Sequence, residues 1–274
     1  MMWYKLVFKQ NQPIHIGSVN WGVINQTFVF IPGWTMWGAL TKAYNMYNRE
    51  SLSENQELFK NITCFYPCFD KNGDNFLFPQ YKDGVFHLGE DYPEDKFRYE
   101  FTETFVSTAI LPESRSARDE SLHEIEILLP KSKIEKKQLY WVGLLGINQD
   151  DDFKDFLEEG LKIWIGGDLR YGFGELELMV KNEVKNDDLK RWQITNRAML
   201  DNSSLNEELK NFLECSSDLN FQGELILHAE LDFLQNEPRV KEARYLITPG
   251  SKILNGLNSK NYKLKKGKFI KLGG

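Results

Sequence analysis

Residues 166–174 (GGDLRYGFG) stand between two segments, 161–165 and 175–180, that alternate apolar and polar side chains. Alternation with a period of two is typical of β-strands, so the nine residues are predicted to connect two strands. Four of the nine are glycines, and glycine lets a backbone turn tightly and bring amide groups close to an anion. The segment lacks the Gly-Lys-Ser/Thr ending of a Walker loop. A strand and not a helix follows it, which excludes a dinucleotide-binding fingerprint.

Three side chains of this loop are suited to a nucleic acid. Arg170 can pair with a phosphate in bidentate fashion, and Tyr171 or Phe173 can stack on a base. A purely structural hairpin, in which the glycines only satisfy positive φ angles, explains the same residues equally well. The loop alone therefore leaves both interpretations open.

The rest of the chain predicts more strands than helices. Segments 3–9, 97–106, 122–129 and 138–147 alternate as strands do, whereas the apolar side chains of 34–47 recur every three or four residues and predict a helix that Thr35 caps. Residues 187–213 are predicted to be mostly helical. Because the strands are not followed by regular crossover helices, we expect an α+β fold with helices on one face of an antiparallel sheet.

Composition excludes several classes of protein. The 274 residues, 41% hydrophobic and 27% charged, suit one large domain or two modest ones. No apolar run approaches the length of a bilayer span, and Met1–Lys9 lacks a signal-peptide core, so no membrane association is expected. The three cysteines are too few for a disulfide framework and suit a reducing compartment. These features predict a cytoplasmic protein.

The charge is unevenly distributed. The formal net charge is −6, which argues mildly against a nucleic-acid binder. Residues 245–274, however, contain seven lysines and no acid, so this stretch carries +7 and the rest of the chain −13. Such a polarised chain is able to present a basic face to a polyanion. The alternative is that lysines 263–271 form a solvated tail.

Four segments together resemble the RAMP superfamily, the RNA-binding proteins of CRISPR systems. The strand–loop–strand unit around 166–174 resembles the glycine-rich loop of that family. Residues 13–18 (PIHIGS) resemble its N-terminal "hHhG" segment, and 31–40 (IPGWTMWGAL) resemble the "IPGSSLKGAL" segment that opens the first helix. Residues 108–129, followed by YWVG at 140–143, resemble the mid-domain segment of type III effector subunits. The four segments occur in the family's order.

The resemblance implies a ferredoxin-like, RNA-recognition-type domain over residues 1–180, with 181–274 as a C-terminal extension or second lobe. It also implies CRISPR RNA as ligand, with a large polymerase-like subunit and backbone RAMP subunits of a type III effector complex as partners. No cofactor is expected.

The family contains backbone subunits, processing endoribonucleases and handle-binding subunits. Between Gly17 and Pro32 there is no Asp or Glu, so the target-cutting aspartate of backbone subunits has no counterpart. Tyr66-Pro67 and residues 248–252 (TPGSK) resemble segments of handle-binding subunits. The resemblance therefore indicates a non-catalytic subunit that grips the 5′ repeat-derived handle, most like the type III-D version. A backbone subunit, or an endoribonuclease that uses His15 as acid or base, remains the alternative.

The residues expected to contact RNA lie in the helix-opening motif, a polar loop and the glycine-rich loop: Gly33, Trp34, Thr35, Trp37, Lys42, Arg115, Arg118, Gly166, Gly167, Arg170, Tyr171, Gly172, Phe173 and Gly174. Trp34 and Trp37 replace small hydroxyl and basic residues of the family, so base stacking or partner packing is expected there in place of a phosphate contact. No metal is expected, because Cys64 and Cys68 lack a second ligand pair at zinc spacing.

Overall fold

The structure, a computed structural model, describes residues 1–148, 155–201, 207–232, 237–255, 257 and 261–272. None of the helices within these residues has the length and apolar character needed to cross a membrane.

A five-stranded antiparallel sheet forms the centre of the molecule, with the strand order β13-β14-β1-β12-β4. Its strands are β1 (Met2–Gln10), β4 (Tyr66–Cys68), β12 (Tyr140–Ile147), β13 (Lys162–Trp164) and β14 (Glu175–Glu183). β1 pairs with both β14 and β12, and β4 pairs with the outer edge of β12. Without the added edge strand β13, this is the strand order of a ferredoxin-like sheet.

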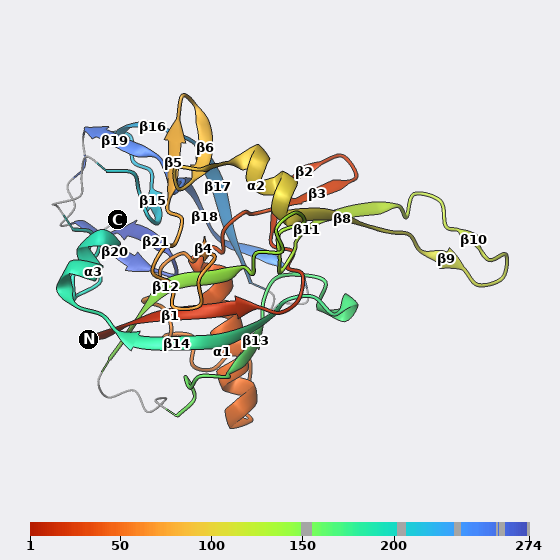
Figure 1. The fold of residues 1–274 in the computed structure, drawn as a ribbon, viewed down its shortest axis with the longest axis horizontal. Helices are drawn as coiled ribbons and strands as arrows, with labels where there is room; N and C mark the ends of the chain where they lie inside the picture. The colour runs from red at the N-terminus through yellow and green to blue at the C-terminus, as the bar shows by residue number, and fades with distance from the viewer. Residues whose placement is uncertain (149–154, 202–206, 233–236, 256, 258–260, 273–274) are drawn as a thin grey trace.

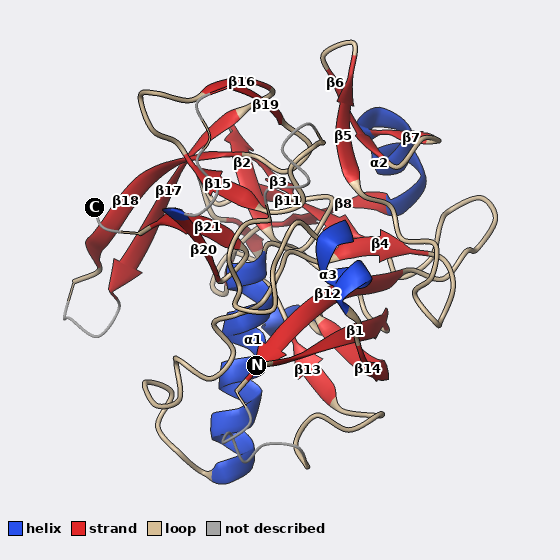
Figure 2. Ribbon diagram, turned by 90° about the vertical axis from the view of Figure 1, so that its left-hand side faces the viewer, coloured by secondary structure: helices blue, strands red, loops and turns tan. Residues whose placement is uncertain are grey.

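The long helix α1 (Gly33–Asn48) packs on one face of this sheet (Figure 1; Figure 2). Its side chains Met36, Ala39 and Leu40 are buried in the same core as strands β1 and β12, as the three-and-four spacing predicts. The helix follows Pro32 and has no side-chain cap, so Thr35 lies inside the first turn and the prediction that it caps the helix is wrong.

A second five-stranded sheet is built from the C-terminal part of the chain. Its order is β17-β18-β15-β21-β20, with β15 and β21 parallel and the other pairs antiparallel. The strands are β15 (Phe212–Glu214), β17 (Leu225–Asp232), β18 (Arg239–Ile247), β20 (Tyr262–Lys265) and β21 (Lys268–Lys271). The lysine-rich stretch thus forms strands of a sheet, and the alternative of a solvated tail is wrong for it.

A four-stranded sheet carries a long projection. Its order is β2-β3-β11-β8, with β2 (Gly17–Trp21), β3 (Ile24–Thr27), β8 (Thr102–Ser107) and β11 (His123–Leu128). Beyond β8 and β11 the chain continues into β9 (Ile110–Leu111) and β10 (Ser116–Ala117). Residues 108–122, here called the arm, extend away from the body of the molecule (Figure 1).

The remaining elements are short. They are the strands β5 (Pro79–Lys82), β6 (Val85–Leu88), β7 (Tyr92–Pro93), β16 (Asn220–Gln222) and β19 (Lys252–Asn255), the helices α2 (Glu94–Phe101) and α3 (Asn186–Arg191), and the 3₁₀ turn η1 (Leu169–Tyr171).

Two predicted elements differ from the structure. The predicted strand 97–106 is half helix, because Phe97 and Phe101 lie four residues apart and α2 turns both rings into the core. The helix predicted over 187–213 is confined to α3, and the chain beyond it enters β15; residues 202–206 lie outside the described part. In both cases packing against distant residues outweighs the local pattern.

The predicted fold class is confirmed: the chain is α+β, with a ferredoxin-like antiparallel sheet and its long helix on one face. The division into 1–180 and 181–274 stays a prediction, and position 180 lies inside β14.

Candidate functional site

Two of the sequence motifs meet across one groove. The face of α1 that contains Thr35, Gly38 and Lys42 lies opposite the start of the glycine-rich loop. The hollow between them, here called the groove, has a volume of about 440 Å³. Its lining consists of Ile16, Gly17, Trp34, Thr35, Gly38, Ala39, Lys42, Trp164, Ile165, Gly166, Gly167 and Leu169. Lys42 is the one charged side chain among the described residues that line it, so the groove is open to an anion.

The glycine-rich loop is folded by local backbone geometry. Gly166, Gly172 and Gly174 have φ angles of 81°, 82° and 97°, and Asp168 also lies in the left-handed region with φ 55°. Between them η1 forms a single tight turn. Glycine adopts these angles without steric cost, which explains three of the four glycines. Gly167 has no such requirement.

The segment 13–17 holds the glycine-rich loop through backbone hydrogen bonds. The carbonyl of His15 accepts a hydrogen bond from the Gly167 amide at 2.9 Å, and that of Pro13 accepts one from the Gly174 amide at 2.8 Å. A Cβ at Gly166 would overlap the His15 carbonyl oxygen. Two sequence motifs that lie far apart in the chain therefore hold one another in place.

Several loop amides already have partners inside the chain. Besides Gly167 and Gly174, the amide of Tyr171 donates to the Asp168 carbonyl at 2.9 Å and that of Gly172 donates to the Leu169 carbonyl at 3.1 Å. These amides are therefore committed to folding the loop. The side chains and the exposed face of the loop remain for a ligand.

His15 has a structural position. Its side chain is 8% exposed and its Nδ1 donates to the carbonyl of Glu126 at 2.7 Å. The ring lies beneath Gly167, where an added Cβ would come within 3.7 Å of His15 Cδ2. The histidine thus joins the loop to β11.

The two aromatic side chains of the loop differ in exposure. Phe173 is buried with Ile125, Ile127 and Phe105, so it anchors the loop on the four-stranded sheet and is removed from the RNA-contacting set. Gly174 is buried as well, so it too is removed from the set of residues expected to contact RNA. Tyr171 is 49% exposed, with its ring 5.0 Å from that of Phe105, and Arg170 is exposed. The tip of the loop is open to solvent.

The predicted residues at the start of α1 separate into two groups. Thr35 and Lys42 face the groove, and Lys42 is exposed. Gly33 is buried, because its Cα packs so closely on Gly267 that a Cβ would overlap the backbone there. Gly33 is therefore a packing glycine and not an RNA contact.

Both tryptophans of the helix-opening motif pack on the C-terminal sheet. The Trp34 ring lies 4.6 Å from Phe212 and 4.4 Å from His228, centroid to centroid. Trp37 has the ammonium of Lys266 3.4 Å from its ring centre. Both rings are thus engaged within the chain itself, so base stacking and packing against a partner subunit stay predictions for these positions, and Trp34 also lines the groove.

The lysines on the last hairpin are partly enclosed, which the sequence did not indicate. Lys268 lies 5.6 Å from the ring centre of Trp34 and is 6% exposed, and burial lowers its pKa to about 8. Burial likewise lowers the pKa of Lys266, although Glu230 lies 3.4 Å from its ammonium. The neighbouring His228 has its pKa lowered to about 4, mainly by burial. Lys266 and Lys268 are thus part of a core between α1 and the C-terminal sheet.

Arg115 and Arg118 lie on the arm and are exposed. The arm projects away from α1 and β13, so the structure does not bring these arginines to the groove (Figure 1).

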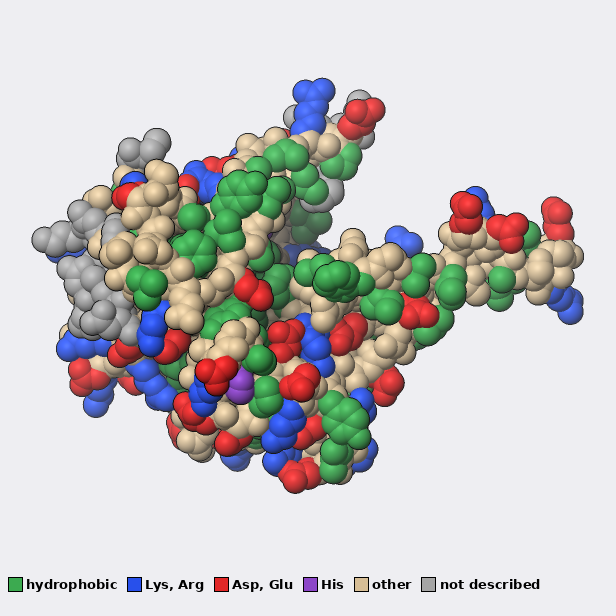
Figure 3. All heavy atoms as spheres, turned by 90° about the horizontal axis from the view of Figure 1, so that it is seen from above, with side chains coloured by type: hydrophobic (Ala, Val, Ile, Leu, Met, Phe, Trp, Pro, Cys, Tyr) green, Lys and Arg blue, Asp and Glu red, His purple; other side chains and the backbone are tan. Residues whose placement is uncertain are grey.

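A larger hollow adjoins the groove, and sequence reasoning did not find it. This hollow, here called the chamber, has a volume of about 720 Å³ and lies between the β2–β3 hairpin, the start of α1, the β5–β6 hairpin and β17. Seen from above, the molecule is hollowed between the arm and the C-terminal part, with hydrophobic side chains gathered around (Figure 3). The aromatic residues that form it come from four separate segments, so no local pattern indicates it.

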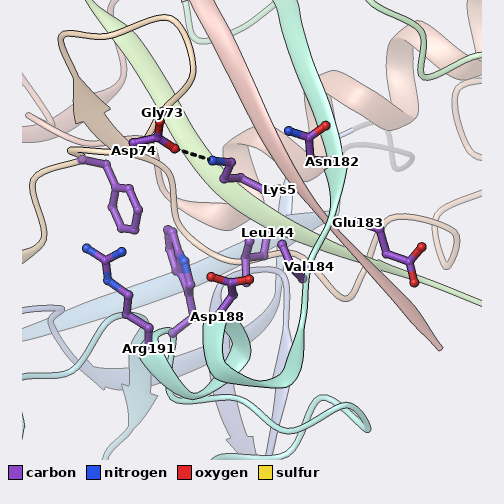
Figure 4. A pocket seen from close by; sticks show the side chains of 11 residues that line it. Lys5, Gly73, Asp74, Leu144, Asn182, Glu183, Val184, Asp188 and Arg191 are labelled. Carbon is purple, nitrogen blue, oxygen red and sulfur yellow. Dashed lines mark hydrogen bonds and ion pairs between the residues drawn. The ribbon is translucent and has the colours of Figure 1, made fainter.

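A third hollow lies at the opposite end of the central sheet. Lys5 and Asn182, which face one another across β1 and β14, line it together with Asp74 and Arg191. Figure 4 shows Lys5 and Asp74 pointing toward one another, and their charged atoms are 3.1 Å apart. Arg191 lies 4.7 Å from the ring centre of Phe76. Because Lys5 is paired with Asp74 and Arg191 lies against Phe76, we do not assign RNA binding here.

No metal centre is present among the described residues: none of their His, Cys, Asp and Glu side chains form a group of three or more suited to an ion. Cys64 and Cys68 are both buried and unpaired, and burial raises the pKa of each thiol to about 12.

Comparisons with known proteins bear on the fold. No protein-family model matches the chain, and no curated protein matches its sequence. Among solved structures, it matches a chain of the type III-B Cmr-beta bound to cognate target RNA and AMPPnP, with a TM-score of 0.58 and 15% identity over 91% of this chain and 85% of that chain. A chain of Cmr-beta bound to cognate target RNA gives a TM-score of 0.56, again at 15% identity, over 91% and 86% of the two chains.

This chain shares the fold of those Cmr-beta chains. At such low identity the likeness concerns the fold. It agrees with the fold that the four RAMP-like motifs imply. The neighbours are type III-B and not the type III-D version that the resemblance indicated.

Proposed function

We propose that this chain is a non-catalytic subunit of a type III CRISPR effector complex that binds the 5′ repeat-derived handle of CRISPR RNA in the groove. Two independent lines support the proposal. The motifs resemble those of RAMP handle-binding subunits, and the fold matches chains of Cmr-beta structures that were determined with cognate target RNA.

The groove itself carries the proposal. It joins the helix-opening motif and the glycine-rich loop, and Lys42 is its one charged side chain among the described residues. A cation beside small residues admits the sugar–phosphate backbone closely, and phosphate contacts dominate the affinity of nucleic-acid binding. Arg170, exposed on the same loop, adds a guanidinium suited to a second phosphate.

Binding is favoured over cleavage. RNA cleavage without a metal needs a base at the 2′-hydroxyl and a proton donor at the leaving oxygen. The described lining of the groove contains no histidine and no carboxylate. His15 is enclosed beneath the loop and its Nδ1 is engaged with Glu126.

The proposed partners are the other subunits of the complex, a large polymerase-like subunit and backbone RAMP subunits. The β17–β18 ribbon supports such contacts, because Leu231, Val240 and Tyr245 are 42%, 61% and 59% exposed. Large exposed apolar side chains gathered on one face mark protein interaction surfaces.

The test uses Gly38, which faces the groove from within α1. A Cβ at this position meets no atom within 4 Å, so a larger side chain would enter the groove without displacing the fold. We expect Gly38→Glu to weaken binding of a repeat-derived handle RNA by about 10- to 100-fold, since it places a carboxylate beside the RNA phosphates. Filter binding measures the effect.

Gly38→Ala is the matched control, because it adds only a methyl group and favours the helix. Its affinity should stay within about twofold of the parent chain. Equal affinities of the parent chain, Gly38→Glu and Gly38→Ala would show that RNA does not bind in the groove. If the parent chain showed no salt-sensitive RNA binding, the proposed function would be overturned.

A further inference from the structure

The strand β17 is an open edge of the C-terminal sheet. It is eight residues long, and β18 is its one neighbour among the described strands, where Figure 2 shows both at the margin of the molecule. The other edge of the same sheet is covered, because the amide of Leu264 in β20 donates to the carbonyl of Ala198 at 2.7 Å. β17 contains no proline and no lysine, the residues that commonly protect such edges. It is therefore able to pair with a further strand.

The backbone groups of β17 point to this edge in a fixed alternation. Just before the strand, the carbonyl of Glu224 accepts a hydrogen bond at 3.0 Å from the amide of Thr248, its partner in the register of β17 and β18. In an antiparallel pair, hydrogen-bonded positions alternate with positions whose amide and carbonyl groups point away from the partner. The amides and carbonyls of Leu225, Leu227 and Ala229 therefore point to the open edge.

The side chains at the same alternate positions are apolar and exposed. Leu225, Leu227 and Leu231 are 44%, 61% and 42% exposed, and Ala229 is exposed as well. The acidic side chains of the strand occupy the positions in between. A strand added at this edge would gain main-chain hydrogen bonds and apolar contacts together, which is how extended segments add to open sheets.

We propose that β17 pairs in antiparallel fashion with β17 of a second copy of this chain, about a two-fold axis at Ala229. Ala229 then lies opposite itself, and Leu227 lies opposite Leu231 of the second copy. These pairs join backbone groups that point outward, so each pair exchanges both of its amide–carbonyl hydrogen bonds. The same strand serves on both sides, as in other two-fold interfaces. The inference goes beyond the proposed function and does not depend on RNA binding.

The acidic side chains select this register. An axis one or two residues nearer the start of the strand would place Glu224 opposite Asp232 or opposite Glu230. An axis one or two residues nearer the end would place Glu230 opposite itself or opposite Asp232. Like charges directly opposite one another destabilise a strand pair. With the axis at Ala229, Glu230 lies opposite His228, and no two acids of the described strand face one another.

A second copy is favoured over a strand of another protein, because the match lies within β17 itself. Leu227 and Leu231 stand at equal distances on either side of Ala229, so each copy offers a leucine where the other has one. The pairing uses the edge of the strand. The exposed side chains of β18, Val240 and Tyr245, therefore stay available to other subunits.

The oligomeric state of the full chain tests the inference. Sedimentation equilibrium without RNA should show a monomer–dimer equilibrium between about 5 and 200 µM, because a dimer becomes more populated as the concentration rises. Leu227→Lys and Leu231→Glu, each alone, should raise the dissociation constant of the dimer at least about 10-fold, because each places a charge against a leucine. Both side chains are exposed, so circular dichroism should not change.

Leu254→Lys is the matched control, since Leu254 is 58% exposed and lies on β19. It should leave the dissociation constant within about twofold of the parent chain, because a surface substitution away from the interface has little effect.

The combination of Leu227→Lys with Leu231→Glu tests the register. In the pairing about Ala229, the introduced ammonium of one copy lies opposite the introduced carboxylate of the other, on both sides of the axis. The dissociation constant should therefore return to within about threefold of that of the parent chain, because opposite charges favour a cross-strand pair.

Three results would overturn the inference. They are a parent chain that stays monomeric at about 200 µM, a dimer that neither single substitution weakens, and a combined variant that recovers no dimer. None of them bears on the groove. Filter binding of RNA, measured separately, decides the proposed function.

Discussion

The groove and the chamber share Gly17 and Trp34, yet they offer different chemistry to a ligand. The groove is lined by small residues, several large apolar side chains and one exposed lysine. The chamber is lined by aromatic and aliphatic side chains and by two carboxylates, of which Glu94 is paired with Arg98. The groove therefore suits a phosphate, and the chamber suits a planar neutral group.

The difference shows why net charge misleads for this chain. The overall charge of −6 argues against a nucleic-acid binder, and two of the C-terminal lysines, Lys266 and Lys268, are buried against tryptophans. What matters locally is that the described lining of the groove contains no acid. Binding of a single strand needs a local basic contact and rings for its bases, not a basic chain.

The largest expected effect comes from exchanging charges at the two hollows. Lys42→Glu should weaken handle RNA binding by about 10- to 100-fold, because it replaces a phosphate contact with repulsion. Glu224→Lys, the opposite exchange at the chamber, should change the affinity by less than about threefold, since the phosphates lie outside the chamber and salt screens distant charges. Filter binding at one salt concentration compares both variants. Equal and opposite effects would show that the phosphates contact both hollows.

The next effect concerns the stability of the fold, through Lys268, which is buried against Trp34. Burial lowers the folded-state pKa of Lys268 to about 8 from 10.5, so the folded chain releases this proton before the unfolded chain does as the pH rises. Stability should therefore increase with pH between these two values. Lys268→Met removes the buried charge and should stabilise the fold at about pH 7 by at most about 3 kcal/mol.

Urea unfolding of the parent chain and of Lys268→Met at several pH values tests this expectation. The advantage of the variant should fall steadily above about pH 8 and vanish only about one pH unit above 10.5, where the lysine is largely neutral in the unfolded chain as well. A constant difference across this range would show that Lys268 titrates normally in the fold.

A smaller effect is expected at the tip of the glycine-rich loop. Arg170→Ala should weaken handle RNA binding by about 3- to 10-fold through loss of one charge-assisted phosphate contact. The side chain is exposed, so circular dichroism and the thermal midpoint should not change. Arg170→Lys keeps the charge but loses the planar guanidinium. Its RNA affinity should therefore lie between that of the parent chain and that of Arg170→Ala. An unchanged affinity for Arg170→Ala would restrict RNA contact to α1.

The smallest effect is expected on the arm. Changing Arg115 and Arg118 together to alanine should alter binding of a short handle RNA by less than about twofold, because the arm extends away from the groove. A longer RNA that continues past the groove should lose more. One assay with both RNA lengths measures the difference. An equal loss of affinity for the short and the longer RNA would show that the arm contacts the handle itself.

Several parts of this account could be predicted from sequence. The alternation in β14 and the three-and-four spacing in α1 follow from which side chains face the core. The strand β12 is buried on both faces after Tyr140, so its burial does not alternate. The glycine-rich loop could also be located, because positive φ angles at Gly166, Gly172 and Gly174 require glycine in a connector between strands. Local rules decide these features.

Other parts depend on contacts between distant segments. Nothing near Gly33 indicates that Gly267 packs on it, and nothing near Phe173 indicates its burial with Ile125. The spacing of Phe97 and Phe101 fits both a strand and a helix, so the local pattern does not distinguish α2 from a strand. The chamber combines rings from four segments, so only the folded chain shows it.

The most direct test of the central claim is the salt dependence of handle RNA affinity for the parent chain and for Lys42→Ala. For single strands, the logarithm of the binding constant falls with the logarithm of salt concentration by about 0.7 per phosphate contact. The account predicts a slope shallower by about 0.7 in Lys42→Ala, with weaker binding at low salt. Parallel lines for the two proteins would contradict a phosphate contact in the groove.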